Sequence, residues 1–201
     1  MTKAELTERF KSACRRVTGA EAELTEIDSK FGDADHGITM TKIAAAIEGA
    51  VEESQGGIRA MLDDAAMAVM MLNGGSAVPL WNTWLDGMQE AAPEGEEISA
   101  GELKEMFRQA YETLFALSKA KVGDKTMMDA LIPATEAMQA AGDDEAAIFD
   151  AAAEAALKGA ENSKNFVSRF GRARSYGEAT IGTPDAGAVS MSYFFAGLAG
   201  K

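Results

Sequence analysis

Hydrophobic residues recur three or four positions apart along nearly the whole chain, with charged residues and alanines between them. This spacing places apolar side chains on one face of a helix, whereas a half-buried strand alternates at every second residue. Alternating runs of β-branched residues are almost absent, while the helix formers Ala, Glu, Leu, Met and Lys are frequent. The sequence therefore predicts an all-α protein.

Glycines, prolines and capping residues divide this pattern into eight predicted helices. They span residues 3–28, 38–55, 58–72, 76–91, 100–120, 125–141, 144–161 and 186–199, with a short helical piece near 164–170. Ser99 and Glu102 have the spacing of a capping box at the start of one helix. Pro133 falls inside another helical pattern and predicts a kink or an interruption there.

Two groups of large residues at helical spacing are predicted to fill the core. One group is Met61, Met67, Met70 and Met71, and the other is Trp81 and Trp84. Methionine adapts to irregular gaps between helices, and such spacing arises more often from packing than from ligand stacking. Neither group is assigned to a functional site.

Length and charge restrict the classes of function. With 201 residues and 47% hydrophobic content, we expect one domain over residues 1–201. The net charge of −13 argues against a nucleic-acid partner, because a phosphate backbone would be repelled. The longest apolar run, 65–72, is too short for a membrane span, and the N-terminus lacks a signal-like apolar stretch. Because the single Cys14 cannot form an internal disulfide, we expect a cytoplasmic protein without a membrane partner.

Three aspartates and the only histidine lie within nine residues between two predicted helices: Asp28, Asp33, Asp35 and His36. Taken alone, Asp33 and Asp35 also fit ordinary turn or N-cap residues. An EF-hand fits poorly, because counting from Asp33 puts Ala44 where a bidentate glutamate is required. Mg²⁺ prefers a few carboxylates together with substrate phosphates, so the cluster predicts part of a Mg–nucleotide site. A lone histidine is weak support for zinc, and His36 is given a supporting role.

Small and polar residues interrupt the helical pattern in four further segments: 72–80, 122–129, 171–178 and 181–188. Each alone is adequately explained as a helix connection or a helix start. The Gly74-Gly75 turn leads into a helix whose first N–H groups can bind an anion, and Arg172 and Arg174 can bind phosphate. No Walker lysine loop is present and no strand precedes a G-x-G-x-x-G motif, which excludes P-loop and Rossmann sites. A phosphate site built from helix-connecting loops remains, and it suits phosphoryl transfer.

These motifs occur in a specific order. They are Asp28-x4-Asp33-x-Asp35-His36-Gly37, Gly74-Gly75, Gly123-Asp124-Lys125-Thr126-Met127-x-Asp129-Ala130-Leu131-x-Pro133, Gly171-Arg172-Ala173 and Gly182-x-x-Asp185-x-Gly187-Ala188. In this order the chain resembles the nucleotide-binding L subunit or domain of dihydroxyacetone kinases over almost its whole length.

The resemblance implies a closed barrel of eight amphipathic, antiparallel helices that binds ADP or ATP through Mg²⁺. It implies that Asp28, Asp33 and Asp35 bind the metal, and that Arg172 is a candidate phosphate stabiliser. No residue is assigned as a certain catalyst. The positions implied to contact or border the nucleotide are His36, Thr39, Gly75, Ser76, Gly123, Met128, Arg172, Pro184 and Asp185.

In that family a separate K subunit or domain holds the hydroxyketone, so the resemblance implies half of a ketose kinase that needs a partner. The phosphoryl donor is a phosphotransferase-system protein for some members and ATP for others. Here Ser76-Ala77-Val78 differs from the usual family turn, which leaves the ketose open, including a four-carbon one. Two alternatives are a nucleotide-loaded adapter that signals to a regulatory partner, and a helical scaffold with acidic caps.

Overall fold

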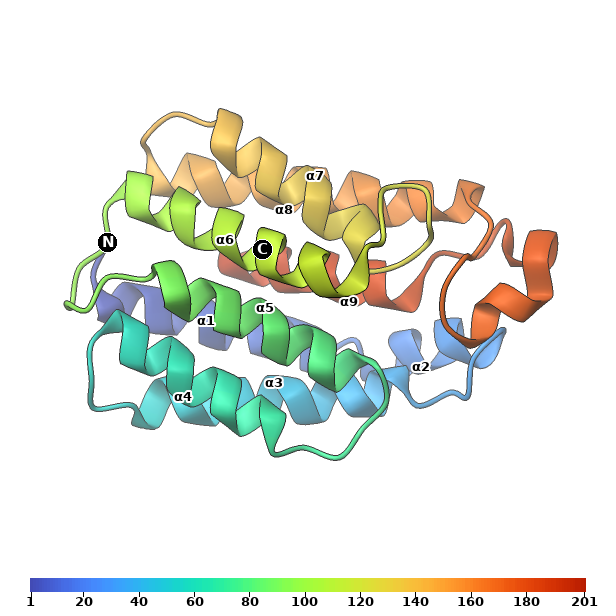
Figure 1. Ribbon diagram of the computed structural model, residues 1–201, viewed down its shortest axis with the longest axis horizontal. Coiled ribbons are helices and arrows are strands. Elements are labelled where there is room, and N and C mark those ends of the chain that lie inside the picture. The colour runs from blue at the N-terminus through green and yellow to red at the C-terminus, as the bar shows by residue number, and fades with distance from the viewer.

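The structure is a computed structural model that describes residues 1–201, and it is all-helical (Figure 1). The helices are α1 (Lys3–Thr18), α2 (Glu21–Ser29), α3 (His36–Glu53), α4 (Ile58–Met70), α5 (Ala77–Ala91), α6 (Ala100–Ser118), α7 (Met128–Ala140), α8 (Glu145–Asn162) and α9 (Ala186–Leu198). Two 3₁₀ segments, η1 (Ser163–Asn165) and η2 (Arg172–Thr180), lie between α8 and α9. The predicted all-α class is confirmed.

Eight of the helices close into a ring. From α3 to α9 each helix packs against the next, α1 packs against α3, and α9 returns to α1, while the short α2 packs against α3 and α9. Lys3 at the start of α1 donates to the carbonyls of Ser54 and Gly56 just after α3, and Arg9 in α1 donates to the Leu198 carbonyl at the end of α9. These contacts make α1 antiparallel to both neighbours, as expected for the barrel.

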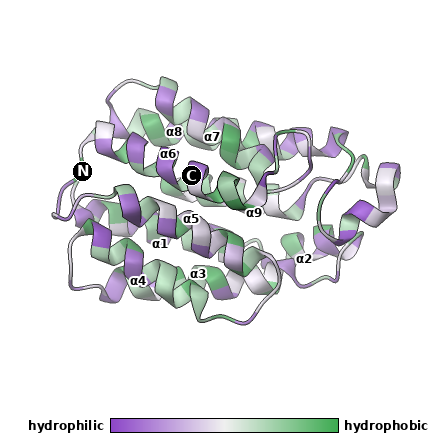
Figure 2. Cartoon of the chain, in the orientation of Figure 1, coloured by the Kyte–Doolittle hydropathy of each residue, from purple (hydrophilic) through white to green (hydrophobic).

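The inside of the ring is a continuous apolar core. Trp81 and Trp84 are almost fully buried and meet edge to face with ring centroids 5.4 Å apart. Phe194 of α9 packs on both rings, at 5.1 Å and 5.6 Å. Figure 2 shows hydrophobic and hydrophilic stretches alternating along the helices, as amphipathic barrel helices require. The packing role predicted for both tryptophans is confirmed.

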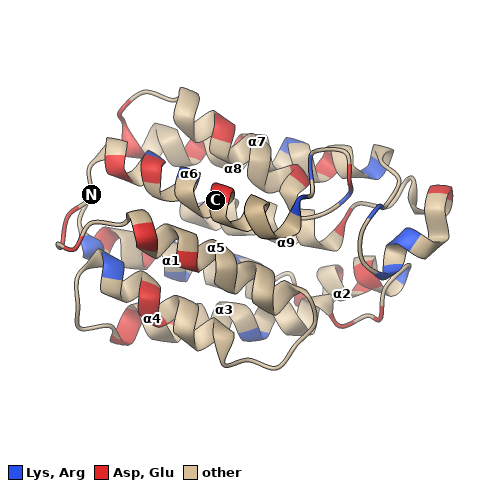
Figure 3. Ribbon diagram, viewed as in Figure 1, with Lys and Arg blue, Asp and Glu red and all other residues tan.

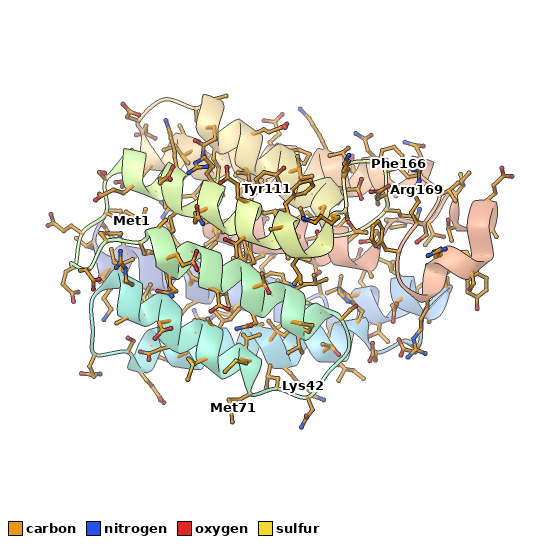
Figure 4. All side chains as sticks on the ribbon, in the orientation of Figure 1. Met1, Lys42, Met71, Tyr111, Phe166 and Arg169 are labelled. Atoms are coloured by element: carbon orange, nitrogen blue, oxygen red, sulfur yellow. The ribbon has the colours of Figure 1, made fainter.

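The Met-rich group is mostly not core, which corrects the prediction. Met61 is fully buried, but Met67, Met70 and Met71 are 52%, 53% and 77% exposed. The three lie in the last turn of α4 and just after it, on the face opposite the buried residues Met61, Ala65 and Val69 (Figure 4 labels Met71). Met67, Met70 and Met71 share one face of the helix with one another, but this face is not the one that contains Met61.

Several boundaries also differ from the prediction. The helix predicted over 3–28 is two helices, because the chain turns at Gly19-Ala20 between α1 and α2. The helical piece predicted near 164–170 is only the short η1, and the helical turn η2 lies later, where a loop was expected. The capping box of Ser99 and Glu102 is confirmed by reciprocal hydrogen bonds.

Helix α7 continues through Pro133, so the predicted interruption is wrong. Proline lacks the N–H that would bond the carbonyl of Asp129, four residues earlier. Gly159 of α8 packs against that carbonyl so closely that a Cβ there would lie 2.0 Å from the oxygen. The absence of a side chain on Gly159 therefore lets α8 approach the part of α7 that contains the proline.

None of the helices combines the length and the apolar character that a membrane span requires.

Candidate functional site

A cavity of about 680 Å³ opens at one end of the barrel. Helices α3, α5, α7 and α9 all begin there, and their first residues, His36, Ala77, Met128 and Ala186, line it. This is the end of Figure 1 at which α2 and the η2 turn lie. The positive ends of four helix dipoles therefore surround one space, which favours anionic groups.

The three predicted metal ligands meet at the wall of this cavity. Asp28 ends α2, Asp33 lies in the following loop, and Asp35 directly precedes α3. One oxygen of each carboxylate lies within 4.8 Å of the others. Oxygen donors so close together suit a hard divalent cation, so the donor set fits Mg²⁺.

Asp35 occupies the N-cap position of α3 but does not act as a cap. Its side chain makes no capping hydrogen bond. Instead the Asp28 carboxylate accepts from the backbone N–H of Asp35, at 3.1 Å, and of His36, at 3.4 Å. Partial burial and the neighbouring Asp33 and Asp28 carboxylates raise the pKa of Asp35. A bound cation would offset the repulsion among these three carboxylates. Residues that served only as helix caps would not gather three negative charges in one place.

The loop backbone is shaped to bring these groups together. A Cβ on Gly32 would lie 2.0 Å from Oδ1 of Asp28, so the loop passes the carboxylate only because Gly32 has no side chain. Ala34 has a left-handed φ of 60° between the two loop aspartates. Such a conformation is uncommon outside glycine and is found at strained functional loops.

Arg172, the first residue of η2, reaches across the cavity mouth to the aspartates. Its Nη2 lies 2.7 Å from Oδ2 of Asp33, and both side chains are accessible to solvent. Tyr176 of η2 packs against Phe31 of the aspartate loop with ring centroids 5.2 Å apart. In Figure 3 basic residues of the η2 region lie beside the acidic loop after α2. The guanidinium thus stands where it can bind either carboxylate or phosphate.

His36 and Thr39 lie on the first turns of α3 and line the cavity. His36 Nε2 lies 3.0 Å from the hydroxyl of Ser190, which donates to the carbonyl of Gly187. Burial lowers the pKa of His36, so the ring is neutral near pH 7.

The glycine turn before α5 faces the aspartates from the opposite side. A Cβ on Gly75 would lie 4.0 Å from Oδ2 of Asp35, and Ser76 starts α5 without a side-chain capping bond. Both residues line the cavity. Val78 is buried, with its Cγ2 beside Gly74, so it packs below the turn.

Met128, Pro184 and Asp185 also line the cavity, whereas Gly123 does not. Gly123 adopts a φ of 99° and donates its N–H to the Asp129 carboxylate at 2.6 Å. Asp185 caps α9 by accepting from the N–H of Ala188 at 2.8 Å. Burial, together with the nearby Asp129 carboxylate, raises the pKa of Asp185 to about 7.

The lining residues that were not assigned to the site from sequence include Phe31, Trp81 and Lys125. Trp81 was assigned to packing alone, yet it both packs in the core and forms part of the cavity wall. The available signal for Lys125 was its position as the only basic residue in the 122–129 segment.

Comparison with known proteins shows the family of the chain. The model of the family described as DAK2 domain matches residues 30–200. The L-erythrulose kinase of Pectobacterium atrosepticum is 36% identical over 181 residues, covering 85% of this chain and 30% of that protein. The PEP-dependent dihydroxyacetone kinase ADP-binding subunit DhaL of Escherichia coli is 29% identical over 191 residues, covering 92% of this chain and 91% of that protein.

The fold also matches a solved structure. The dihydroxyacetone kinase from C. freundii in complex with AMP-PNP and Mg²⁺ superimposes with a TM-score of 0.75 at 22% identity. The match covers 98% of this chain and 34% of that one. This chain thus spans about a third of the length of the erythrulose kinase and of the solved kinase, but nearly all of the DhaL subunit.

Proposed function

The chain belongs to the DAK2 domain family, and from this membership we propose that it is the nucleotide-binding subunit of a ketose kinase. In this proposal residues 1–201 act as one domain that presents ADP or ATP with Mg²⁺ to a hydroxyketone held by a K subunit. The observation that carries the proposal is the convergence of Asp28, Asp33 and Asp35 within 4.8 Å, beside a cavity surrounded by helix N-termini.

The three aspartates would hold Mg²⁺. When bound, the metal neutralises phosphate charge and orients the nucleotide for phosphoryl transfer. The Gly75-Ser76 start of α5 lies opposite the aspartates, and its backbone N–H groups and hydroxyl would bind the phosphate end. His36 lines the cavity beside this site and is given a supporting role there.

Arg172 would stabilise the phosphates. Its ion pair with Asp33 is exposed, and exposed ion pairs contribute little free energy to stability. Replacing the Asp33 carboxylate by a phosphate as the partner of Arg172 therefore costs little. Thr39, Met128, Pro184 and Asp185 form the remaining cavity wall around the nucleotide. Gly123 does not line the cavity and would act indirectly, because its N–H orients the Asp129 carboxylate.

The acceptor is proposed to be a short hydroxyketone of three or four carbons. Relatives of this chain include both an L-erythrulose kinase and a subunit of a dihydroxyacetone kinase. The DhaL relative is an ADP-binding subunit of a PEP-dependent kinase. A phosphotransferase-system protein is accordingly one proposed phosphoryl donor, and exchanging ATP is the other.

The donor is tested by denaturing the purified protein and identifying released nucleotide by chromatography. Stoichiometric ADP that survives purification supports a resident nucleotide that is rephosphorylated in place. A nucleotide-free protein that binds ATP with Mg²⁺ supports exchange.

The enzymatic role is tested by mixing the chain with a cognate K subunit, ketose and phosphoryl donor. Ketose phosphate formed only when both subunits are present supports the kinase. Nucleotide binding without transfer for either dihydroxyacetone or erythrulose supports the alternative of an adapter for a regulatory partner.

A further inference from the structure

The Lys125 ammonium is buried beside the cavity and bonded only to backbone carbonyls. The residue is 4% exposed, and its Nζ donates to the carbonyls of Ser163 at 2.7 Å, Phe166 at 3.1 Å and Thr183 at 2.5 Å. An ammonium has three N–H donors, and all three are used. Lys125 therefore has no donor left for a phosphate in this arrangement.

The three carbonyls belong to the two ends of one segment of chain. Ser163 precedes the segment 166–183, Phe166 begins it and Thr183 ends it. The segment contains η2, and with it Arg172 and the ring of Tyr176 that packs on Phe31. A single side chain thus fastens both ends of the segment that reaches across the cavity mouth (Figure 4 labels Phe166 and Arg169 near its start).

Other contacts add to these bonds at the ends of the segment, among them the N–H of Asp185, which donates to Ser163 Oγ at 2.9 Å, and an exposed ion pair of Arg169 with Asp124 at 3.6 Å. Gly182 donates its N–H to the Lys164 carbonyl at 2.7 Å, and Arg169 donates its N–H to the Asp124 carbonyl at 3.1 Å. Within the segment, the Ser168 N–H donates to Thr180 Oγ1 at 3.0 Å. The segment has only 3₁₀ structure and exposes Phe170, Tyr176 and Ile181, so apolar burial contributes little to its position.

We propose that Lys125 is a positioning residue, which holds the ends of segment 166–183 together and so fixes Arg172 and the 183–185 wall around the nucleotide. This rests on the proposed nucleotide-binding function, because the benefit of the fixed geometry is phosphate binding. Lys125 adopts a left-handed φ of 61°, directly after the Gly123-Asp124 turn. Asp185 follows the Thr183 carbonyl by two residues, so the same contact orients the start of α9.

Lys125→Met keeps a long side chain but removes all three hydrogen bonds. The matched control is Lys121→Met, which loses the same charge from an exposed residue of the same loop. Hydrogen exchange without nucleotide is measured at the N–H groups of Ser168, Arg169 and Gly182, with α4 as an internal reference. The expected result is exchange about tenfold faster or more in K125M at these three sites, with α4 and K121M at wild-type rates. Wild-type exchange rates in a folded K125M, or equal acceleration in α4, would overturn the proposal.

Binding of Mg–ADP to the same proteins is the second measurement. The expected result is a Kd raised about tenfold in K125M and unchanged in K121M. Faster exchange with an unchanged Kd would mean that Lys125 serves the fold alone. A wild-type protein that binds no Mg–ADP contradicts the proposed function, while the exchange measurement still decides whether Lys125 holds the segment.

Lys125→Arg covers the case in which K125M does not fold. Arginine keeps the charge, but its planar fork cannot meet three carbonyls that surround one nitrogen, so the same three amides are expected to exchange faster. A structure of the wild-type protein with Mg–ADP adds a test without any variant. Nζ retained on the three carbonyls supports the positioning role, and Nζ moved to a phosphate overturns it.

Discussion

The Arg172 guanidinium lies 2.7 Å from the Asp33 carboxylate, across the mouth of the cavity. A residue proposed to bind phosphate and a residue proposed to bind metal are therefore each other's partners in the absence of ligand. The pair couples the two halves of the proposed site, because a cation and Arg172 compete for the same carboxylate.

Arg172→Met is expected to shift metal and nucleotide binding in opposite directions. Without Arg172 the aspartate cluster loses its competing cation, so Mn²⁺ alone should bind a few-fold tighter. Mg–ADP should bind about tenfold weaker, because one charged hydrogen bond to phosphate is lost. Titrations of R172M with each ligand measure both effects. Arg174→Met is the control, since Arg174 has no ion pair in the structure. If R172M changed the affinities for Mn²⁺ and for Mg–ADP in the same direction, the competition between Arg172 and the cation for Asp33 would be refuted.

Asp33→Asn and Asp35→Asn should each weaken Mg–nucleotide binding by at least about tenfold, because each removes one charged ligand. Helical content should remain normal, because both side chains are exposed and outside the core. Binding is measured by calorimetry and helical content by circular dichroism. Asp64→Asn, an exposed aspartate on α4, is the control. Unchanged binding in both site variants would remove the metal assignment.

Asp185 predicts a pH dependence of stability. Its pKa is about 7 in the folded protein, whereas an unfolded aspartate has a pKa of about 3.9. A carboxyl with a raised folded-state pKa stabilises the fold fully below about pH 4, and this stabilisation is lost as the pH rises through about 7. Asp185→Asn keeps a capping oxygen for α9 but cannot ionise. In urea unfolding without metal, its stability relative to wild type should rise between about pH 4.5 and 8, and a constant difference would contradict this.

Gly159→Ala should destabilise the barrel by at least about 1–3 kcal/mol, because the new Cβ would overlap the Asp129 carbonyl and separate α7 from α8. Gly49→Ala is the control on α3, where a Cβ has nothing within 4 Å. That variant should be more stable than wild type by about 0.4–1 kcal/mol. Denaturant unfolding of both proteins gives the two values, and the account of the α7–α8 contact is wrong if both changes have the same sign.

The sequence predicted the helices well because apolar periodicity and capping report local structure directly. It missed the turn at Gly19-Ala20, where Gly19 keeps a right-handed conformation and the amphipathic pattern continues across the break. It placed Met67, Met70 and Met71 in the core, because they recur at helical spacing, but their face of α4 is opposite the buried face that contains Met61.

The candidate site was predictable only in part. Asp28, Asp33 and Asp35 are close in sequence, so a single loop can bring them together. The pairing of Arg172 with Asp33 joins distant segments, and no spacing rule predicts it. Lys125 is hydrogen-bonded to three backbone carbonyls. Because every residue has a backbone carbonyl, the amino-acid sequence does not show which residues accept these bonds.

The central claim is that the aspartate cluster binds a nucleotide through Mg²⁺. Calorimetric titration of nucleotide-stripped protein with ADP, in Mg²⁺ and then in EDTA, tests it most directly. The account predicts one binding event per chain in Mg²⁺ that disappears in EDTA and is weakened in D33N. No binding in Mg²⁺, or equal binding in EDTA, would contradict it.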